Sequence, residues 1–210
     1  MKPACAVIVF AKAPVAGSAK TRLAGTLGAA GAARLAARML DATTACALEA
    51  AVGPVEVCCA PDATHPAFTA LTRPAAGLML TEQGDGDLGQ RMHRALERVL
   101  ATQASAIVIG TDAPALDAGY LCEAATVLQV HDAAIGPAVD GGYALIGLRR
   151  PAAALFDGID WSTSRVLAQT RERLGRLGLT WVELAPLHDI DEPADLRHLP
   201  ARWAPLPLQE

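Results

Sequence analysis

The sequence predicts an α/β protein with a mostly parallel but mixed sheet. Short apolar runs, several of them rich in Val and Ile, alternate with longer segments in which Ala, Leu and Arg recur at helical spacing, a pattern typical of alternating strands and helices. The chain has 210 residues, enough for one sizeable core. Gly141 and Gly142 lie between two apolar runs and indicate a hairpin, so two neighbouring strands are expected to be antiparallel.

The individual elements follow from these runs. Seven strands are expected, at Cys5–Phe10, Val55–Cys59, Leu78–Thr81, Ala106–Ile109, Ala133–Gly136, Ala144–Leu148 and Thr180–Leu184. Six helices are expected, at Ala29–Ala51, Ala63–Thr72, Leu88–Thr102, Ala118–Val130, Ser164–Leu177 and Pro193–His198. The first apolar run is too short to span a bilayer and is interpreted as a core strand. Residues 1–200 are expected to form one domain, and residues 201–210 a Pro-rich tail.

Composition and charge exclude several classes of protein. Hydrophobic residues make up 52% of the chain and charged residues 19%, which argues against disorder. A net charge of −4 leaves no broad cationic surface for nucleic acid or an anionic membrane. The five cysteines include no C-x-x-C pair, so they are interpreted as reduced thiols of a cytoplasmic protein. The five histidines show no metal-ligand spacing and no nearby nucleophile elbow, so a hydrolase triad is not predicted.

The first expected strand leads into a loop that concentrates positive charge. Lys12, Lys20 and Arg22 lie in this basic loop, although the whole chain has only three lysines. Gly17 and the other small residues would let backbone N–H groups approach an anion, so we expect the loop to bind phosphate. Its spacing matches neither a Walker A loop nor the G-x-G-x-x-G dinucleotide motif. A solvated surface turn is the alternative.

Asp112 follows the expected strand Ala106–Ile109, in the segment G-T-D-A-P. A carboxylate at the carboxyl end of a buried strand can bind a hard cation such as Mg²⁺ or Mn²⁺. The alternative is that Asp112 caps the turn after the strand. Because open α/β sheets bind ligands where the strand order reverses, we expect Asp112 and the basic loop to share one cleft.

A late acidic segment, L-H-D-I-D-E-P-A-D-L, contains Asp189 and Asp191. A divalent cation needs more than one oxygen donor, so either residue could complete a site with Asp112. Asp191 also stands where an N-cap of the helix Pro193–His198 is expected, and as an isolated pattern the cap is favoured.

Asp140 precedes two glycines and an aromatic residue, Gly141, Gly142 and Tyr143. It could orient or deprotonate an acceptor hydroxyl, and the glycines would leave room for the acceptor. A turn-forming role is the alternative. The segment Gly84–Gly89 contains a D-x-D sequence but is interpreted as a loop in which Asp87 caps a helix. Residues Trp161–Arg165 are interpreted as the start of a helix, with a pocket lining as the alternative.

Five sequence blocks together resemble one known family. They are F-A-K-A-P-V-A-G-S-A-K-T-R-L from Phe10, G-D-G-D-L-G-Q-R-M from Gly84, G-T-D-A-P from Gly110, G-P-A-V-D-G-G-Y from Gly136 and D-I-D-E-P-A-D-L from Asp189. Over about residues 4–200 they resemble the bacterial family of predicted GT-A glycosyltransferases, long described as a domain of unknown function, within the nucleotide-diphospho-sugar transferase superfamily. The basic loop and the late acidic block are also similar to those of 2-phospho-L-lactate guanylyltransferase and the molybdenum-cofactor guanylyltransferases.

The resemblance implies a GT-A fold, which is a Rossmann-like three-layer sandwich that binds a nucleotide and Mg²⁺ or Mn²⁺. Carried over by motif, the cations of the basic loop would hold phosphates. Asp112 would be a catalytic residue and the first metal ligand, with Asp191 or Asp189 as the second. Asp140 would be the other catalytic residue, facing the acceptor together with the three residues that follow it.

The family resemblance favours metal-dependent transfer from a nucleotide-diphospho-sugar to a small-molecule acceptor. One departure matters, because Pro114 stands where sugar transferases of this fold carry the second Asp of a D-x-D motif. Nucleotidyl transfer from a nucleoside triphosphate to a phosphorylated small molecule is therefore the alternative. A non-catalytic nucleotide-binding module is a third interpretation, and a homodimer is left open.

Overall fold

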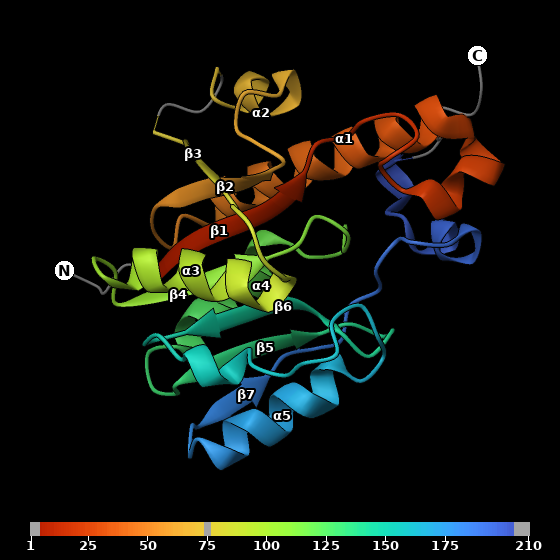
Figure 1. Cartoon of the computed structure of the whole chain (residues 1–210). Coiled ribbons are helices and arrows are strands. Elements are labelled where there is room, and N and C mark those ends of the chain that lie inside the picture. Colours follow the sequence, from red (N-terminus) through yellow and green to blue (C-terminus); the bar gives the residue numbers. More distant parts are fainter. Residues whose placement is uncertain (1–4, 74–76, 204–210) are drawn as a thin grey trace.

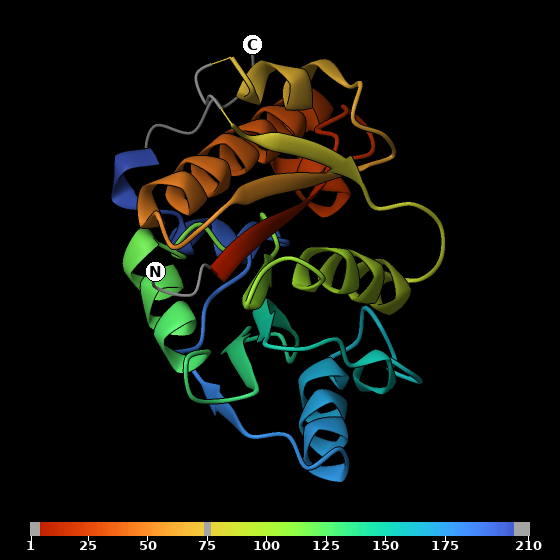
Figure 2. The same ribbon diagram turned by 90° about the vertical axis from the view of Figure 1, so that its left-hand side faces the viewer.

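The computed structural model describes residues 5–73 and 77–203, which form a seven-stranded sheet with helices on both faces (Figures 1 and 2). The strands are β1 (Cys5–Lys12), β2 (Val55–Ala60), β3 (Met79–Glu82), β4 (Ser105–Ile109), β5 (Ala133–Pro137), β6 (Tyr143–Leu148) and β7 (Trp181–Glu183). The α-helices are α1 (Ala24–Ala50), α2 (Pro66–Leu71), α3 (Leu88–Leu100), α4 (Ala118–Val127) and α5 (Val166–Arg176). Short 3₁₀ helices are η1 (Thr21–Leu23), η2 (Ala153–Leu155), η3 (Pro193–His198) and η4 (Ala201–Trp203).

The sheet has the order β3-β2-β1-β4-β6-β5-β7. β6 is antiparallel to both of its neighbours, β4 and β5, whereas every other pairing is parallel. The hairpin predicted at Gly141 and Gly142 therefore joins β5 to β6, and the predicted mixed sheet is confirmed. From β1 the chain adds β2 and β3 on one side and then returns to place β4 on the other side. The strand order thus reverses between β1 and β4, and the loops that follow these two strands lie at the same edge of the sheet.

Two apolar clusters hold the helices against the two faces of the sheet. The face covered by α1, α2 and α4 buries side chains such as Leu40, Phe68 and Leu121. The face covered by α3 and α5 buries Leu96 and Leu174 among others. Figures 1 and 2 show the resulting three layers. This arrangement confirms the predicted three-layer α/β sandwich.

A third apolar cluster lies beyond the sheet and fixes the basic loop in place. Leu23 of η1 and Ile190, which follows β7, are both fully buried in it, together with Trp203. The cluster thereby packs residues that are far apart in the chain side by side, beyond the carboxyl ends of β1 and β7. Trp203 belongs to the predicted Pro-rich tail at residues 201–210 but is packed in this cluster. Residues 204–210 of that tail lie outside the described ranges.

The predicted strands are found with shifts of one or two residues at their ends, and β1 extends to Lys12. Gly28 has φ 71° inside α1 and interrupts the helix there, which explains why helical periodicity in the sequence begins only at Ala29. The predicted helix Pro193–His198 is a 3₁₀ helix. Within the described ranges, no helix combines the length and the hydropathy needed to cross a membrane.

Candidate functional site

The residues predicted to carry chemistry come from four different connections and meet at one edge of the sheet. Lys20 follows β1, Asp112 follows β4, and Asp140 follows β5, while Asp189 and Asp191 follow β7. The parallel strands end at this edge, so their connections converge there, on the right-hand side of Figure 1. It is the edge at which the strand order reverses, as the sequence predicted for Asp112 and the basic loop.

Backbone hydrogen bonds tie these connections to one another. The Ile190 N–H donates to the Asp112 carbonyl oxygen at 2.8 Å, which joins the segment after β7 to the turn after β4. The Leu187 N–H donates to the Pro137 carbonyl at 2.8 Å, and the Val139 N–H donates to the Leu187 carbonyl at 3.0 Å. The acidic side chains are therefore held by a continuous backbone framework rather than by independent loops.

Lys20 lies among these carboxylates. Its Nζ is 2.6 Å from Asp112 Oδ1 and 2.8 Å from Asp191 Oδ1, and only 8% of its side chain is exposed. Burial disfavours the ammonium charge, but the two carboxylates outweigh this effect and raise the pKa of Lys20. A residue predicted to bind phosphate is thus paired with two residues predicted to bind a metal.

Asp189 is a further acidic side chain of this cluster. Its Oδ1 is buried and has no hydrogen-bond partner within the described residues. Burial, followed by the nearby charges of Asp112, Asp140 and Asp191, raises the pKa of Asp189 to about 7. Four carboxyl groups therefore share one region with the ammonium ion of Lys20, and negative charge is in excess.

This donor set fits a hard divalent cation in its chemistry. Carboxylate oxygens are the ligands that Mg²⁺ and Mn²⁺ prefer, and the buried Asp189 oxygen lacks a partner. As the side chains stand, no group of three or more His, Cys, Asp or Glu residues is arranged to hold an ion in the described part of the chain. The ammonium ion of Lys20 lies between the two carboxylates that would be ligands.

The other predicted phosphate ligands are exposed at the same edge. Lys12 is the exposed last residue of β1. Arg22 has a side chain that is 70% exposed, with one guanidinium nitrogen 3.6 Å from Glu192. Gly17 has φ 82°, a left-handed conformation that favours glycine. The basic loop thus buries one of its three cations and exposes the other two.

Asp140 and the residues after it form a tight turn. The Gly142 N–H donates to Asp140 Oδ1 at 2.9 Å, so the turn-forming interpretation is confirmed, while its charge also acts on Asp189. Gly141 has φ 93°, and a Cβ at this position would overlap the Ser164 carbonyl. Tyr143 packs against the cluster under α3 and α5, and burial raises the pKa of its hydroxyl. The Tyr143 hydroxyl is therefore directed into the protein interior.

The structure decides three interpretations of capping residues. Asp87 caps α3 through a reciprocal pair of hydrogen bonds with Gln90, as predicted. Residues after Trp161 lead into α5, whose N-cap is Arg165, which confirms the start of a helix. The cap of η3 is Glu192, paired with Asp195, so the prediction that Asp191 caps this helix was wrong. The Asp191 side chain instead contacts Lys20.

Sequence reasoning missed Gln83, a buried residue directly after β3. Its Nε2 donates to the Ala11 carbonyl at 3.2 Å and to the Cys58 carbonyl at 3.0 Å. Arg94 donates to the Gln83 carbonyl at 2.7 Å. These bonds hold the ends of β1 and β2 next to the Gly84–Gly89 loop. A lone amide after a short apolar run gives little signal in a sequence.

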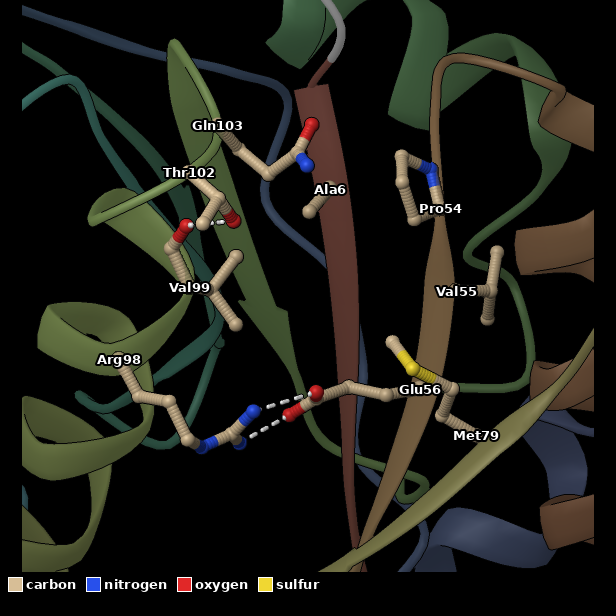
Figure 3. Close-up of a pocket in the computed structure, with 9 residues that line it drawn as sticks. All are labelled: Ala6, Pro54, Val55, Glu56, Met79, Arg98, Val99, Thr102 and Gln103. Atoms are coloured by element: carbon tan, nitrogen blue, oxygen red, sulfur yellow. Dashed lines mark hydrogen bonds and ion pairs between the residues drawn. The ribbon is translucent and has the colours of Figure 1, made fainter.

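A second charged feature lies at the opposite edge, near the amino ends of β1, β2 and β3. Figure 3 shows Arg98 of α3 pointing toward Glu56 of β2, with two hydrogen bonds of 2.8 and 2.6 Å. The Thr81 hydroxyl also donates to Glu56 at 3.2 Å. The adjoining cavity has a volume of about 210 Å³, and none of the residues predicted to carry chemistry lines it.

This Rossmann-like mixed sheet is the fold of solved nucleotide-diphospho-sugar transferases and nucleotidyltransferases. The chain belongs to the bacterial family described as "Uncharacterized protein conserved in bacteria (DUF2064)", whose model matches residues 43–163. The family resemblance inferred from the sequence motifs is thereby confirmed. A search of curated proteins gives no significant match.

Solved structures support the same class. A proposed nucleotide-diphospho-sugar transferase from Desulfovibrio desulfuricans G20 is 29% identical over 96% of this chain and 88% of its own, with a TM-score of 0.86. CMP:2-keto-3-deoxy-manno-octonic acid synthetase in complex with CTP is 14% identical over 93% of this chain and 96% of its own (TM-score 0.58). Glucosyl-3-phosphoglycerate synthase from Mycobacterium tuberculosis, bound to Mn²⁺, UDP and phosphoglyceric acid, is 11% identical over 94% and 74% (TM-score 0.55). The last two share the fold.

Proposed function

We propose that this protein is a metal-dependent glycosyltransferase that transfers a sugar from a nucleotide-diphospho-sugar to a small-molecule acceptor. The observation that carries the proposal is the meeting of four carboxyl groups with the basic loop at the switch point of the sheet. Such a site can hold a divalent cation on one side and phosphate groups on the other. The five free cysteines fit a protein that acts in the cytoplasm.

Each part of the site has a role in this proposal. Asp112, with Asp191 or Asp189, would hold Mg²⁺ or Mn²⁺. When bound, such an ion supplies positive charge that stabilises a departing nucleoside diphosphate. Lys12 and Arg22, which are exposed at the same edge, would donate charge-assisted hydrogen bonds to phosphate oxygens.

The acceptor would lie on the side of Asp140. The Gly142 N–H fixes the orientation of the Asp140 carboxylate, which could then accept the proton of an acceptor hydroxyl as that hydroxyl attacks the sugar. Gly141 and Gly142 form the turn that holds Asp140 in this position, and the absence of a side chain at Gly141 lets the Ser164 backbone pack against the turn. The likeness to the Desulfovibrio protein supports sugar transfer, and the synthase bound to Mn²⁺ and UDP has the same fold.

Nucleotidyl transfer is the second candidate, and one feature of the site favours it. Pro114 stands two residues after Asp112, at the position that the second Asp of a D-x-D motif would occupy. Its acidic partners come from the distant segment after β7, to which it is joined through Lys20 and through the Ile190 N–H. A phosphorylated acceptor would then attack the α-phosphate of a nucleoside triphosphate, and the basic loop would stabilise the pyrophosphate that leaves.

Product analysis distinguishes the two reactions. The protein is incubated with Mn²⁺ and either a panel of nucleotide-sugars or a panel of nucleoside triphosphates, and nucleoside diphosphate and pyrophosphate are measured, with Asp112→Asn as the control. Sugar transfer predicts slow release of nucleoside diphosphate by the parent alone, because water can replace the acceptor. Asp112-dependent release of pyrophosphate, with no turnover of any nucleotide-sugar, would instead establish nucleotidyl transfer. Binding of nucleotides without turnover in either panel would favour a non-catalytic nucleotide-binding module.

A further inference from the structure

Lys20 and Arg22 belong to the same loop but have opposite environments. The Lys20 side chain is 8% exposed and is paired with Asp112 and Asp191, whereas the Arg22 side chain is 70% exposed. If Lys20 only bound phosphate, its side chain would be expected to be exposed to solvent in the free protein, as the Arg22 side chain is. Lys20 instead occupies the acidic side of the site.

The backbone around Lys20 is anchored, while its side chain is held by ion pairs. Lys20 has φ 48° and ψ 46°, a left-handed conformation that residues other than glycine adopt rarely. Its carbonyl accepts the Leu23 N–H at 2.9 Å, and Leu23 is fully buried in the third apolar cluster with Ile190. The flexible four-carbon side chain can therefore change direction while the loop stays in place.

The carboxylates that Lys20 contacts are the same ones that a divalent cation would use. One ammonium ion neutralises part of the charge of four carboxyl groups, and the buried Asp189 oxygen still lacks a partner within the described residues. An ammonium ion and a divalent cation cannot both lie between Asp112 and Asp191. Binding of one must therefore weaken binding of the other.

We propose that Lys20 is an internal counter-ion that neutralises Asp112 and Asp191 until a divalent cation displaces it. The displaced ammonium ion then turns toward the diphosphate, which enters with the cation. This role presupposes the proposed metal-dependent function, and it makes Lys20 a positioning residue in the free protein and a phosphate ligand in the loaded one. Removing the charge of Lys20 should therefore strengthen binding of the cation to the free protein and weaken binding of the diphosphate to the loaded protein.

The test measures Mn²⁺ binding without nucleotide, by the electron paramagnetic resonance signal of free Mn²⁺ at constant ionic strength. In Lys20→Met, Mn²⁺ should bind on the order of tenfold more tightly than in the parent, because the competing cation is gone. Lys20→Arg keeps the charge and should not show this gain. Arg165→Met removes a cation whose side chain is 67% exposed and is paired with Asp160; it serves as the matched control, with a much smaller change expected.

Adding UDP or GDP gives the second measurement. With Mn²⁺ present, Lys20→Met should bind the diphosphate more weakly than the parent does, because the displaced ammonium is missing. Mn²⁺ should also raise the melting temperature of Lys20→Met more than that of the parent. This measurement shows whether the variant is folded and binds Mn²⁺, even where the substitution lowers its stability. Unchanged or weaker Mn²⁺ binding by Lys20→Met, in a parent that binds Mn²⁺ with UDP, would overturn the counter-ion role alone. A parent that binds no Mn²⁺ with or without nucleotide would overturn the metal-dependent function as well.

Discussion

The two edges of the sheet hold charge in different ways. At the amino edge, one carboxylate meets one guanidinium: Glu56 is 3% exposed and makes two hydrogen bonds with Arg98 and one with Thr81. At the carboxyl edge, four carboxyl groups share one ammonium ion, and a buried oxygen of Asp189 has no partner within the described residues. A balanced pair is complete without a ligand, whereas the excess of negative charge at the carboxyl edge favours a cation.

The charged side chains of the two edges also come from different kinds of segment. Lys20, Gly17 and Gly141 at the carboxyl edge all have positive φ angles, and their connections are joined by long-range hydrogen bonds. Glu56 lies within the regular strand β2, paired in register with Ile8 and Met79. Positive φ angles also occur at the amino edge, at Ala51, Gly77 and Gly178. The difference between the edges is therefore that the charged side chains of the carboxyl edge come from loops, as functional residues often do on a rigid scaffold, whereas Glu56 comes from a strand.

The largest effect is expected for Asp112→Asn at the carboxyl edge. The substitution removes one negative charge and one proposed metal ligand, so metal-dependent turnover should fall by about 100-fold or more. Product release from a nucleotide-sugar with Mn²⁺ is the measurement, and circular dichroism reports the fold.

Asp117→Asn is the matched control for this change. Asp117 is the N-cap of α4, five residues further along the chain, and Asn caps helices as well as Asp does. Its turnover should equal that of the parent. Equal loss of activity in both variants would show that charge anywhere near this turn matters, and that Asp112 is not a ligand.

The sequence was sufficient to predict features that depend on local pattern. Apolar runs such as Val55–Cys59 report burial directly, and all seven predicted strands are present. Asp112 was predicted to meet the basic loop because residues that follow parallel strands share an edge of the sheet, a rule that needs no knowledge of side-chain contacts.

Contacts between distant residues were beyond reach of the same reasoning. Lys20 and Asp191 are 171 positions apart, and in the sequence Lys20 is indistinguishable in kind from Lys12. Only the third apolar cluster, which packs Leu23 against Ile190, brings the two charges together. The cap of η3 was predicted wrongly for a similar reason, because the Asp191 side chain is engaged by the distant Lys20 while Glu192 caps the helix.

A change at the amino edge should affect stability rather than binding. Glu56→Gln breaks the ion pair with Arg98 and should lower the free energy of unfolding by about 2–3 kcal/mol, less than for a fully buried pair because Arg98 is 45% exposed. Urea denaturation measures this effect, and Mn²⁺ binding should be unchanged.

Glu172→Gln is the control for this change. It breaks an exposed ion pair with Arg176 and should lower the free energy of unfolding by less than about 0.5 kcal/mol. A shift in Mn²⁺ affinity for Glu56→Gln would show that the two edges are coupled.

A smaller effect than that of Glu56→Gln is expected at a second satisfied carboxylate of the amino edge. Asp132 precedes β5, and its Oδ2 accepts the Thr180 N–H at 3.0 Å and the Thr180 hydroxyl at 2.9 Å. These hydrogen bonds lower the pKa of Asp132. A carboxyl group whose pKa is lower in the folded state contributes stability above its unfolded pKa, and that contribution disappears as the pH falls through the folded pKa.

The free energy of unfolding of Asp132→Asn should therefore be lower than that of the parent by about 1 kcal/mol at neutral pH. Below the folded pKa of Asp132 the difference should be little or nothing. Urea denaturation at neutral and acidic pH measures the difference, and a difference that stays constant over this range would show that the charge of Asp132 contributes nothing to stability.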